Sequence, residues 1–259
     1  HLRSPKGVAI AIMAQYGIMP LTAFIWGKLF QLGPSESLAI LICSCCPGGN
    51  LSNIFSLALR GDVNLSVVMT ACFMVLAIGL MPLLLYLCLG GLHEGDLEGK
   101  VPYKGIITSL VLMLIPHATG IILNEKKPQY AGLIAKARRM VMLLLSSAAI
   151  IVLSMANMGS CIMVVFSPSL LGTSALMPLT GFLLGCAVSA AFKLDDQCRQ
   201  TMCMETACQN VQLCSASLEV AFTPEIIGPL YFFPLLYLLF QLGEGFLLIL
   251  GFWMHDRIK

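Results

Sequence analysis

Two short polar stretches interrupt long apolar segments of this sequence, and they carry residue types that bind cations or break helices. The first, CCPGGNLSN at 45–53, places Pro47, two glycines and three polar side chains within an aliphatic run. Proline removes a backbone donor and glycine lets the chain leave helical geometry, so this stretch predicts a broken helix. Unsatisfied backbone groups are too costly to face lipid, so the break must be buried in protein or line a watery cavity. A kinked packing helix with close Gly–Gly contact is the alternative, but it does not explain why Asn50, Ser52 and Asn53 occur together.

The second stretch, METACQNVQ at 204–212, contains an acidic residue, Glu205, among amide and hydroxyl side chains. A carboxylate within the hydrocarbon region of a membrane is costly, and it is tolerated when it pairs with a cation or faces water. The sequence offers no lysine or arginine at a comparable depth, so we expect a bound metal cation to be the partner of Glu205. The alternative is a glutamate near a helix end that reaches the cytoplasmic surface past Arg199.

The nature of the cation follows from the oxygen atoms that could surround Glu205. Neutral oxygens are offered by the side chains of Gln15, Ser52, Asn53, Ser66, Thr70 and Gln209. Ser66 and Thr70 share one helix face because they are four residues apart. Calcium and magnesium usually need more carboxylates and softer metals prefer thiolates, so sodium fits best, with unwound backbone carbonyls completing the shell. Two sodium ions beside one glutamate would leave about one positive charge, which predicts an organic anion as cargo.

The elements that must position these residues are membrane-spanning helices. The chain has 259 residues, of which 58% are hydrophobic and only 11% charged, whereas a soluble domain has about 25% charged residues. Eight apolar segments are each long enough to span a membrane as a helix: 7–30, 37–59, 63–90, 105–124, 140–157, 164–192, 200–222 and 226–254. The fold class we predict is therefore all-α and polytopic. A net charge of +2, without a basic patch interleaved with aromatic residues, argues against a nucleic-acid partner.

Positive charges orient the eight segments. If the segments alternate in direction, twelve lysine and arginine residues fall on one side, and three, Lys28, Lys100 and Lys104, fall on the other. Lysine and arginine accumulate on the cytoplasmic side of membrane proteins. We therefore expect a multi-pass protein whose N-terminal loop and C-terminus are cytoplasmic.

Two copies of one motif indicate an internal repeat. IMPLTAF at 18–24 is matched by LMPLTGF at 176–182, and a polar interruption follows each copy at a similar distance, at Asn53 and at Asn210. The second copy lies five segments after the first, so the two insert with opposite topology, which is the plan of many secondary transporters. A chance match in apolar sequence is the alternative. Because one copy has five segments and the other three, we expect one or two helices before His1.

Cysteine and histidine patterns argue against a zinc site and against an enzyme. The eleven cysteines lack the paired spacing of zinc ligands, so we interpret them as small apolar residues. The four histidines do not form a Ser/His/Asp or HExxH arrangement with other residues. An ion channel is harder to exclude from the sequence alone.

Several motifs are similar to those of one family. The stretches QYGIMPLT, CCPGGNLSN, GDVNLSVVMT, PYKGI, METACQNVQLCS and FFPLLYLLFQLGEG together resemble the sodium/bile acid cotransporters, and PGGNLSN and QLGEG favour the liver type. The resemblance covers essentially the whole chain. It implies a core domain, formed by 1–92 and 160–259, in which two discontinuous helices cross. A smaller panel domain would contain 100–158 and one helix that precedes this chain, together with an extracellular N-terminus.

The resemblance also implies site residues. One sodium site carries over onto Ser52, Asn53, Ser66, Thr70 and Glu205. A second carries over onto Gln15, Glu205 and Gln209, with backbone oxygens around Thr206 and Cys208. Asn210 is similar to the substrate-facing asparagine of the family, and we assign Ser215 and Asn157 to the same substrate-binding set.

Two positions depart from the family pattern. Ala207 replaces a glycine, so we expect helical or extended backbone there rather than a positive φ angle. Ala216 stands where the family often has threonine, which puts a possible substrate hydroxyl in doubt.

The function implied by the resemblance is sodium-dependent symport of bile acids and similar amphipathic anions into the cell by alternating access. The partners would be bile salts, sodium ions and membrane lipid, with sodium as a transported ion and no resident cofactor. The implied location is the plasma membrane, on the basolateral side of hepatocytes. Transport of other organic anions, such as sulfated steroids, is the alternative.

Overall fold

The computed structural model describes residues 5–92, 103–126, 167–222 and 228–258. These residues form helices, and the only β-type pairing among them is an isolated bridge between Gly48 and Gln209. The elements in chain order are α1 (Pro5–Met13), the π-helical turn η1 (Ala14–Ile18), α2 (Met19–Leu29), α3 (Pro34–Cys45), α4 (Asn50–Ala58), α5 (Val63–Leu92), α6 (Tyr103–Lys126), α9 (Pro168–Ala191), α10 (Asp196–Ala207), α11 (Val211–Ala221), the 3-10 turn η3 (Gly228–Phe232) and α13 (Phe233–Ile258).

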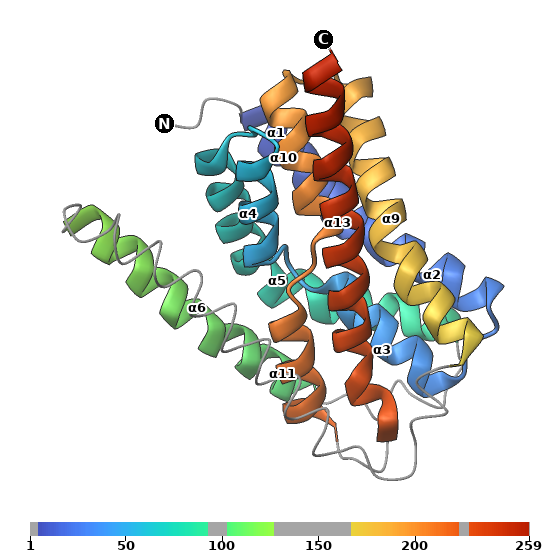
Figure 1. Ribbon diagram of the computed structural model, residues 1–259. Coiled ribbons are helices and arrows are strands. Elements are labelled where there is room, and N and C mark those ends of the chain that lie inside the picture. The colour runs from blue at the N-terminus through green and yellow to red at the C-terminus, as the bar shows by residue number, and fades with distance from the viewer. Residues whose placement is uncertain (1–4, 93–102, 127–166, 223–227, 259) are drawn as a thin grey trace.

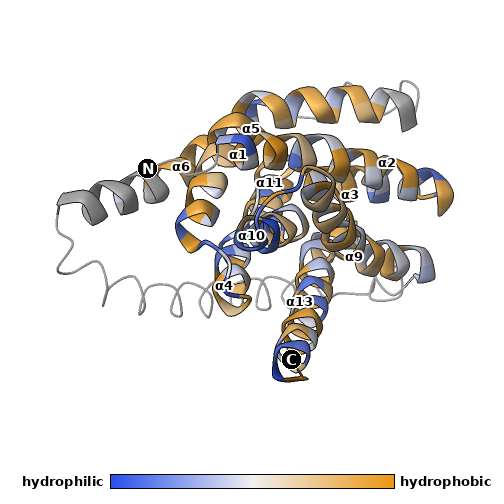
Figure 2. Ribbon diagram, turned by 90° about the horizontal axis from the view of Figure 1, so that it is seen from above, coloured by the Kyte–Doolittle hydropathy of each residue, from blue (hydrophilic) through white to orange (hydrophobic). Residues whose placement is uncertain are grey.

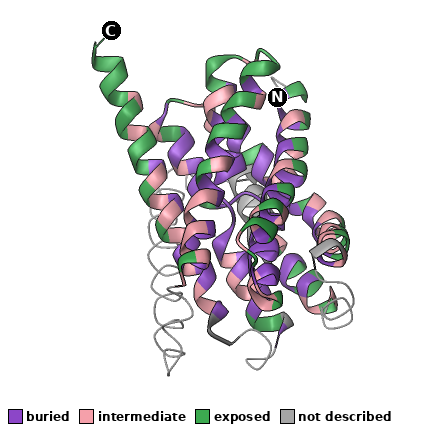
Figure 3. Ribbon diagram, turned by 90° about the vertical axis from the view of Figure 1, so that its right-hand side faces the viewer, coloured by how far each residue is buried: buried purple, intermediate pink, exposed green. Residues whose placement is uncertain are grey.

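Within the described residues, four helical stretches are long and apolar enough to cross a membrane. They are Pro5–Leu29, Val63–Gly90, Pro168–Ala191 and Leu230–Ile258. Large apolar side chains cover outward surfaces, as Leu87 on α5 and Leu247 on α13 do, and Figure 3 shows exposed residues along the outer face of α13. The all-α, polytopic membrane fold predicted from the sequence is confirmed.

Two predicted segments are broken in the middle, and the breaks lie against each other. The segment 37–59 divides into α3 and α4, and the segment 200–222 divides into α10 and α11. In Figure 1, α4 and α10 occupy the upper half of the molecule and α3 and α11 the lower half, with both breaks between them. Figure 2 shows hydrophilic residues of α10 at the centre of a largely hydrophobic group of helices.

The two breaks satisfy each other's backbone groups. The amide of Gly49 donates to the carbonyl of Cys208 at 2.9 Å, and the amide of Asn210 donates to the carbonyl of Pro47 at 2.9 Å. This reciprocal pairing answers the requirement that an interrupted membrane helix must satisfy its polar backbone inside the protein. It is also why the interruptions are stable only as a pair.

Glycines at 48 and 49 allow the breaks to approach closely. A Cβ atom added to Gly48 would lie 2.5 Å from Oε2 of Glu205, and one added to Gly49 would lie 2.9 Å from the carbonyl oxygen of Gln209. Neither glycine is needed for a left-handed backbone, since Gly49 has φ −102° and ψ 172°. These positions therefore need glycine because a side chain would clash with the residues of the other break, and not because the backbone adopts an unusual conformation.

The first spanning helix contains a feature that the sequence interpretation missed. The predicted segment 7–30 is interrupted by the π-helical turn η1, which contains Gln15 and Tyr16, both buried. Pro20 follows, and a proline ring clashes with the carbonyl four residues earlier, which here belongs to Tyr16. Pro178, the matching proline, lies inside the uninterrupted α-helix α9, so the inverted repeat stays a prediction.

The division into core and panel domains also stays a prediction. Within the described residues, α6 packs against α5 and α11. The predicted segment 140–157 and Asn157 lie outside the residues that the structure describes.

Candidate functional site

Glu205 lies at the centre of the two breaks and is fully buried, with 0% of the residue exposed. Its Oε1 atom accepts hydrogen bonds from the hydroxyls of Ser52 at 2.8 Å, Ser66 at 2.5 Å and Thr70 at 3.0 Å. Oε2 lies 3.2 Å from the Thr70 hydroxyl. Three helices, α4, α5 and α10, therefore contribute to one buried polar cluster, which we call the carboxylate cluster (Ser52, Asn53, Ser66, Thr70 and Glu205).

Helix ends position the hydroxyls of this cluster. Ser52 lies in the first turn of α4, directly after the break, and Ser66 lies in the first turn of α5. The start of α5 is fixed by Asp62, whose side chain accepts from the amide of Leu65 at 3.1 Å. The positive end of the α4 dipole therefore lies near the carboxylate, where it favours negative charge without a basic side chain.

The carboxylate cluster contains more acceptor oxygens than hydrogens. The Ser52 hydroxyl lies within hydrogen-bonding distance of the carbonyl of Gly49 (2.6 Å) as well as of Glu205, and the Thr70 hydroxyl lies 2.9 Å from the carbonyl of Ser66. Each hydroxyl has only one hydrogen to donate. Some of these oxygens are therefore left facing one another beside a carboxylate, an arrangement that a cation stabilises.

Asn53 adds a further oxygen to this cluster. Its amide nitrogen donates to the Thr70 hydroxyl at 3.4 Å. Its Oδ1 atom is buried and has no hydrogen-bond partner within the described part of the chain. An unsatisfied buried carbonyl oxygen is costly, and a cation bound by the cluster would satisfy it. The structure thus brings all five predicted residues of the first sodium site together.

The residues of the second predicted sodium site form an adjacent amide cluster (Gln15 and Gln209, with the backbone of Thr206 and Cys46). The Gln15 amide nitrogen lies 2.7 Å from Oε1 of Gln209 and 2.7 Å from the carbonyl oxygen of Cys46. The Gln209 amide donates to the carbonyl of Thr206 at 2.9 Å. Both glutamine side chains are buried. Gln15 comes from the π turn and Gln209 from the second break, so both irregular segments place an amide here.

The hydrogen bonds of the Glu205 side chain run to the carboxylate cluster. The carbonyl of Cys208, predicted to face the second ion, accepts from the amide of Gly49. Gly48 lies between the two clusters, because it contacts Glu205 and forms the bridge with Gln209. The assignment of Glu205 to both sodium sites therefore stays a prediction.

Two of the predicted substrate residues, Asn210 and Ser215, lie on or beside α11. Asn210 is buried and caps α11, since its Oδ1 accepts from the amide of Leu213 at 3.1 Å. Ser215 is half-buried one turn further along, with its hydroxyl 3.4 Å from Oε1 of Glu219. Both residues keep their roles as predictions.

Ala207 is compatible with the break. It is the last residue of α10, and the chain becomes extended at Cys208, with φ −88° and ψ 91°. The expectation of a helical or extended backbone at this alanine is confirmed. The missing glycine is therefore not needed to unwind the helix. A Cβ atom on Gly181 of α9 would lie 2.8 Å from the Cα of Ala207. The glycine that lets these two helices pack closely is therefore Gly181 on α9, and position 207 on α10 can be alanine.

Two buried tyrosines support the site and were missed by the sequence analysis. The hydroxyl of Tyr237 on α13 donates to the carbonyl of Ala207 at 3.2 Å, which satisfies a free carbonyl at the end of α10. The hydroxyl of Tyr16 donates to the carbonyl of Phe73 on α5. Nothing in the sequence distinguishes these tyrosines from other aromatic residues of apolar helices.

A buried acid surrounded by neutral oxygens, at the crossing of two broken helices among membrane-length helices, defines a class of protein. These features are typical of secondary transporters that couple a cation to their cargo.

Comparison with known proteins places the chain within this class. Residues 1–170 match the Sodium Bile acid symporter family. The hepatic sodium/bile acid cotransporter of Homo sapiens is 60% identical over 259 residues, which cover 100% of this chain and 74% of the relative. The Rattus norvegicus protein of the same name is 56% identical over 259 residues, covering 100% of this chain and 71% of the relative. The Homo sapiens sodium-dependent organic anion transporter is 37% identical over 266 residues, covering 99% of this chain and 67% of the relative.

The chain belongs to the sodium bile acid symporter family, and the resemblance inferred from its motifs is confirmed. It is accordingly a multi-pass membrane transporter of the symporter class and not an enzyme.

Proposed function

We propose that this chain moves bile acids into the cell together with sodium ions by alternating access. The human and rat relatives at 60% and 56% identity are both named sodium/bile acid cotransporters. The organic anion transporter, at 37% identity, supports other organic anions as the second candidate cargo. The higher identity to the two bile acid cotransporters than to the organic anion transporter favours bile acids as the cargo. A channel would instead give current without saturable, stoichiometric flux of cargo.

The excess of acceptor oxygens around Glu205 carries this proposal. We assign one sodium ion to the carboxylate cluster, where Asn53 Oδ1 has no hydrogen-bond partner among the described residues and the acceptor oxygens outnumber the available hydrogens. A second ion would lie by the amide cluster, where Gln15 and Gln209 can turn their oxygens towards it. Two ions and one carboxylate leave about one positive charge. This charge attracts an anionic cargo near Asn210 through Coulomb interaction, which couples the two binding events.

Sodium binding would also hold the helices that meet at the crossing in one arrangement. The carboxylate cluster unites α4, α5 and α10, and the reciprocal backbone pairing unites the two breaks. An ion that holds the three helices together favours one arrangement of the crossing, and the cargo binds to that arrangement. The proposed location is the plasma membrane, on the basolateral side in hepatocytes, with the C-terminus in the cytoplasm.

The test is the uptake of a labelled bile salt by cells that express Glu205→Gln, with sodium replaced by another monovalent cation in parallel. We expect this variant to lose sodium-dependent uptake at normal surface expression, because the amide cannot neutralise the ions. The matched control is Asp196→Asn on the same helix, whose side chain is 79% exposed, and it should transport normally. Normal uptake with unchanged sodium dependence in Glu205→Gln would rule the proposal out.

A further inference from the structure

A pair of cysteines joins α9 to α10, outside the residues assigned to the sodium sites. Cys186 on α9 is exposed, whereas Cys203 on α10 is buried, with 3% of the residue exposed. The two thiols are close enough to interact with each other. The Cys203 sulfur also lies 3.1 Å from the carbonyl oxygen of Phe182. The Cys186 thiol is therefore accessible, whereas the neighbouring Cys203 thiol is shielded from the surroundings of the protein.

The backbones of α9 and α10 come close together at this pair. A Cβ atom added to Gly185, the neighbour of Cys186, would lie 3.1 Å from the Cα of Cys203. A disulfide requires its two Cα atoms to be about 4.4–6.8 Å apart. The glycine lets the backbones of α9 and α10 approach closely at the residue next to Cys186.

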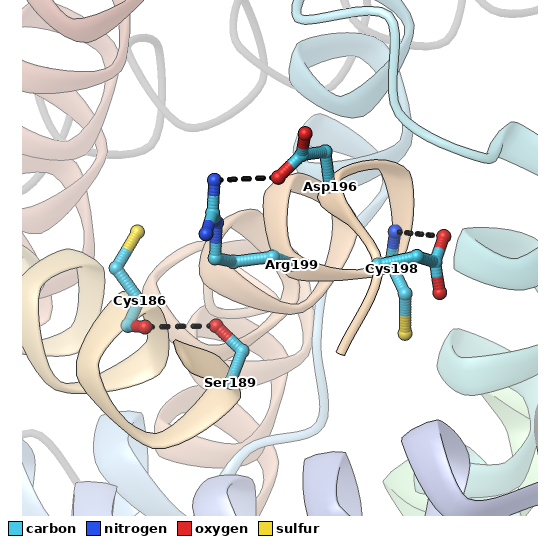
Figure 4. Close-up of polar contacts among 6 residues, drawn as sticks. Cys186, Ser189, Asp196, Cys198 and Arg199 are labelled. Atoms are coloured by element: carbon cyan, nitrogen blue, oxygen red, sulfur yellow. Dashed lines mark hydrogen bonds and ion pairs between the residues drawn. The ribbon is translucent and has the colours of Figure 1, made fainter. Parts of the chain in front are cut away.

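Positive charge lies near the exposed thiol. Figure 4 shows Arg199 of α10 on the same side of the helix pair as Cys186, with no hydrogen bond or ion pair drawn between the two side chains. Arg199 is held in place by Asp196 at 2.7 Å. Exposure and a nearby cation are the conditions under which a cysteine reacts with oxidants.

We propose that Cys186 and Cys203 form a redox-active dithiol, which peroxides convert into a disulfide between α9 and α10. In the first step, the sulfur of Cys186 attacks hydrogen peroxide, the O–O bond breaks, and Cys186 sulfenic acid and water form. In the second step, the thiol of Cys203 attacks that sulfur, the S–O bond breaks, and a second water leaves with the thiol hydrogen. Two thiols and one peroxide thus give one disulfide and two waters.

The disulfide would act on α10 beside the carboxylate cluster. Cys203 precedes Glu205 by two residues on the same helix, so a bond to Cys186 fixes this part of α10 against α9. It would also withdraw the Cys203 sulfur from the carbonyl of Phe182. We therefore expect the oxidised chain to transport less.

The chemical test uses the full chain in cell membranes. The membranes are treated with hydrogen peroxide, denatured, alkylated with N-ethylmaleimide and analysed for disulfides by mass spectrometry. We expect a Cys186–Cys203 linkage that dithiothreitol reverses. Cys186→Ala should leave Cys203 reduced, whereas Cys198→Ala, which removes another buried thiol of α10, should leave the linkage intact. Recovery of both thiols alkylated in the native chain, or of Cys186 linked to another thiol, would overturn the proposal.

The transport test is separate from the chemical one. We expect peroxide to reduce bile-salt uptake several-fold in the native chain and to leave Cys186→Ala unaffected. Equal loss in both chains would overturn the proposed effect of this pair on transport. Because disulfide mapping does not depend on the cargo, the dithiol can fail while the symporter proposal stands, and the reverse also holds.

Discussion

At the scale of single residues, the hydroxyl of Thr70 is the neutral group with the most neighbours around Glu205. It lies within 3.2 Å of both carboxylate oxygens and 2.9 Å from the carbonyl of Ser66, and it accepts from the amide of Asn53. Its single hydrogen cannot serve all these acceptors. Its lone pairs are therefore best used by a cation, and removal of this hydroxyl should weaken sodium binding more than folding.

Thr70→Val keeps the shape of the side chain and removes the hydroxyl. We expect the sodium concentration for half-maximal uptake to rise about 10-fold, equivalent to about 1.4 kcal/mol, with the maximal rate retained at saturating sodium. Uptake measured against sodium concentration checks this. The matched control is Thr173→Val on α9, whose buried hydroxyl donates to its own helix at 2.8 Å. Equal shifts in the two variants would show that the effect is not specific to the carboxylate cluster.

Residue types could be predicted from the sequence better than their contacts. The four-residue spacing of Ser66 and Thr70 predicted that they share one face of a helix, and the lone Glu205 indicated a cation site. Nothing in the sequence showed that Asn53 Oδ1 would lack a partner, because that depends on helices far apart in the chain. The tyrosines at 16 and 237 were missed for the same reason. Each one supports the site by donating a hydrogen bond to a backbone carbonyl that is distant in the sequence.

At the scale of elements, the two breaks depend on the space that glycine leaves. Gly49 faces the backbone of the other break, where a Cβ atom would meet the carbonyl of Gln209 at 2.9 Å and the Cα of Asn210 at 3.1 Å. Backbone cannot move aside as a flexible side chain can. Any larger residue at this position must therefore push the breaks apart and lengthen the reciprocal hydrogen bonds.

Gly49→Ala should therefore abolish sodium-dependent uptake and lower the thermal stability of the purified chain. The matched control is Gly79→Ala on α5, where a Cβ atom would meet nothing within 4 Å. There we expect unchanged uptake and slightly higher stability, since alanine favours a helix over glycine by about 1 kcal/mol. Thermal unfolding in detergent and bile-salt uptake measure both variants. Native uptake in Gly49→Ala would refute the requirement for close approach.

The breaks themselves could be predicted, because Pro47 with two glycines and the polar run after Glu205 both interrupt apolar segments. Their pairing could not, since the sequence does not state which backbone groups satisfy each other. The π turn at Ala14–Ile18 was missed as well. A proline alone does not predict such a turn, because Pro178 lies inside α9, which continues as an α-helix.

At the scale of the whole molecule, sodium should stabilise the folded chain. The carboxylate cluster draws its atoms from α4, α5 and α10, so a bound ion holds together helices that are distant in the sequence. A ligand that binds only the folded state raises stability by about 2.7 kcal/mol when its concentration is 100 times the dissociation constant.

We therefore expect the purified chain to unfold at a higher temperature in sodium chloride than in potassium chloride of equal concentration. Glu205→Gln should unfold at the same temperature in both salts, because the amide removes the charge that holds the ion. Differential scanning fluorimetry in matched buffers makes the comparison. A native chain that unfolds at one temperature in both salts would contradict a sodium site in the carboxylate cluster.

The reciprocal pairing of the breaks also has a consequence for biosynthesis. Ser52 and Glu205, which flank the crossing, are separated by 153 residues, and ribosomes add roughly 5–20 residues per second. At these rates, roughly 8–30 seconds separate the synthesis of the interrupted span at Pro47 from the synthesis of its complement. During that interval the amides and carbonyls of the first break lack the partners that satisfy them in the folded chain.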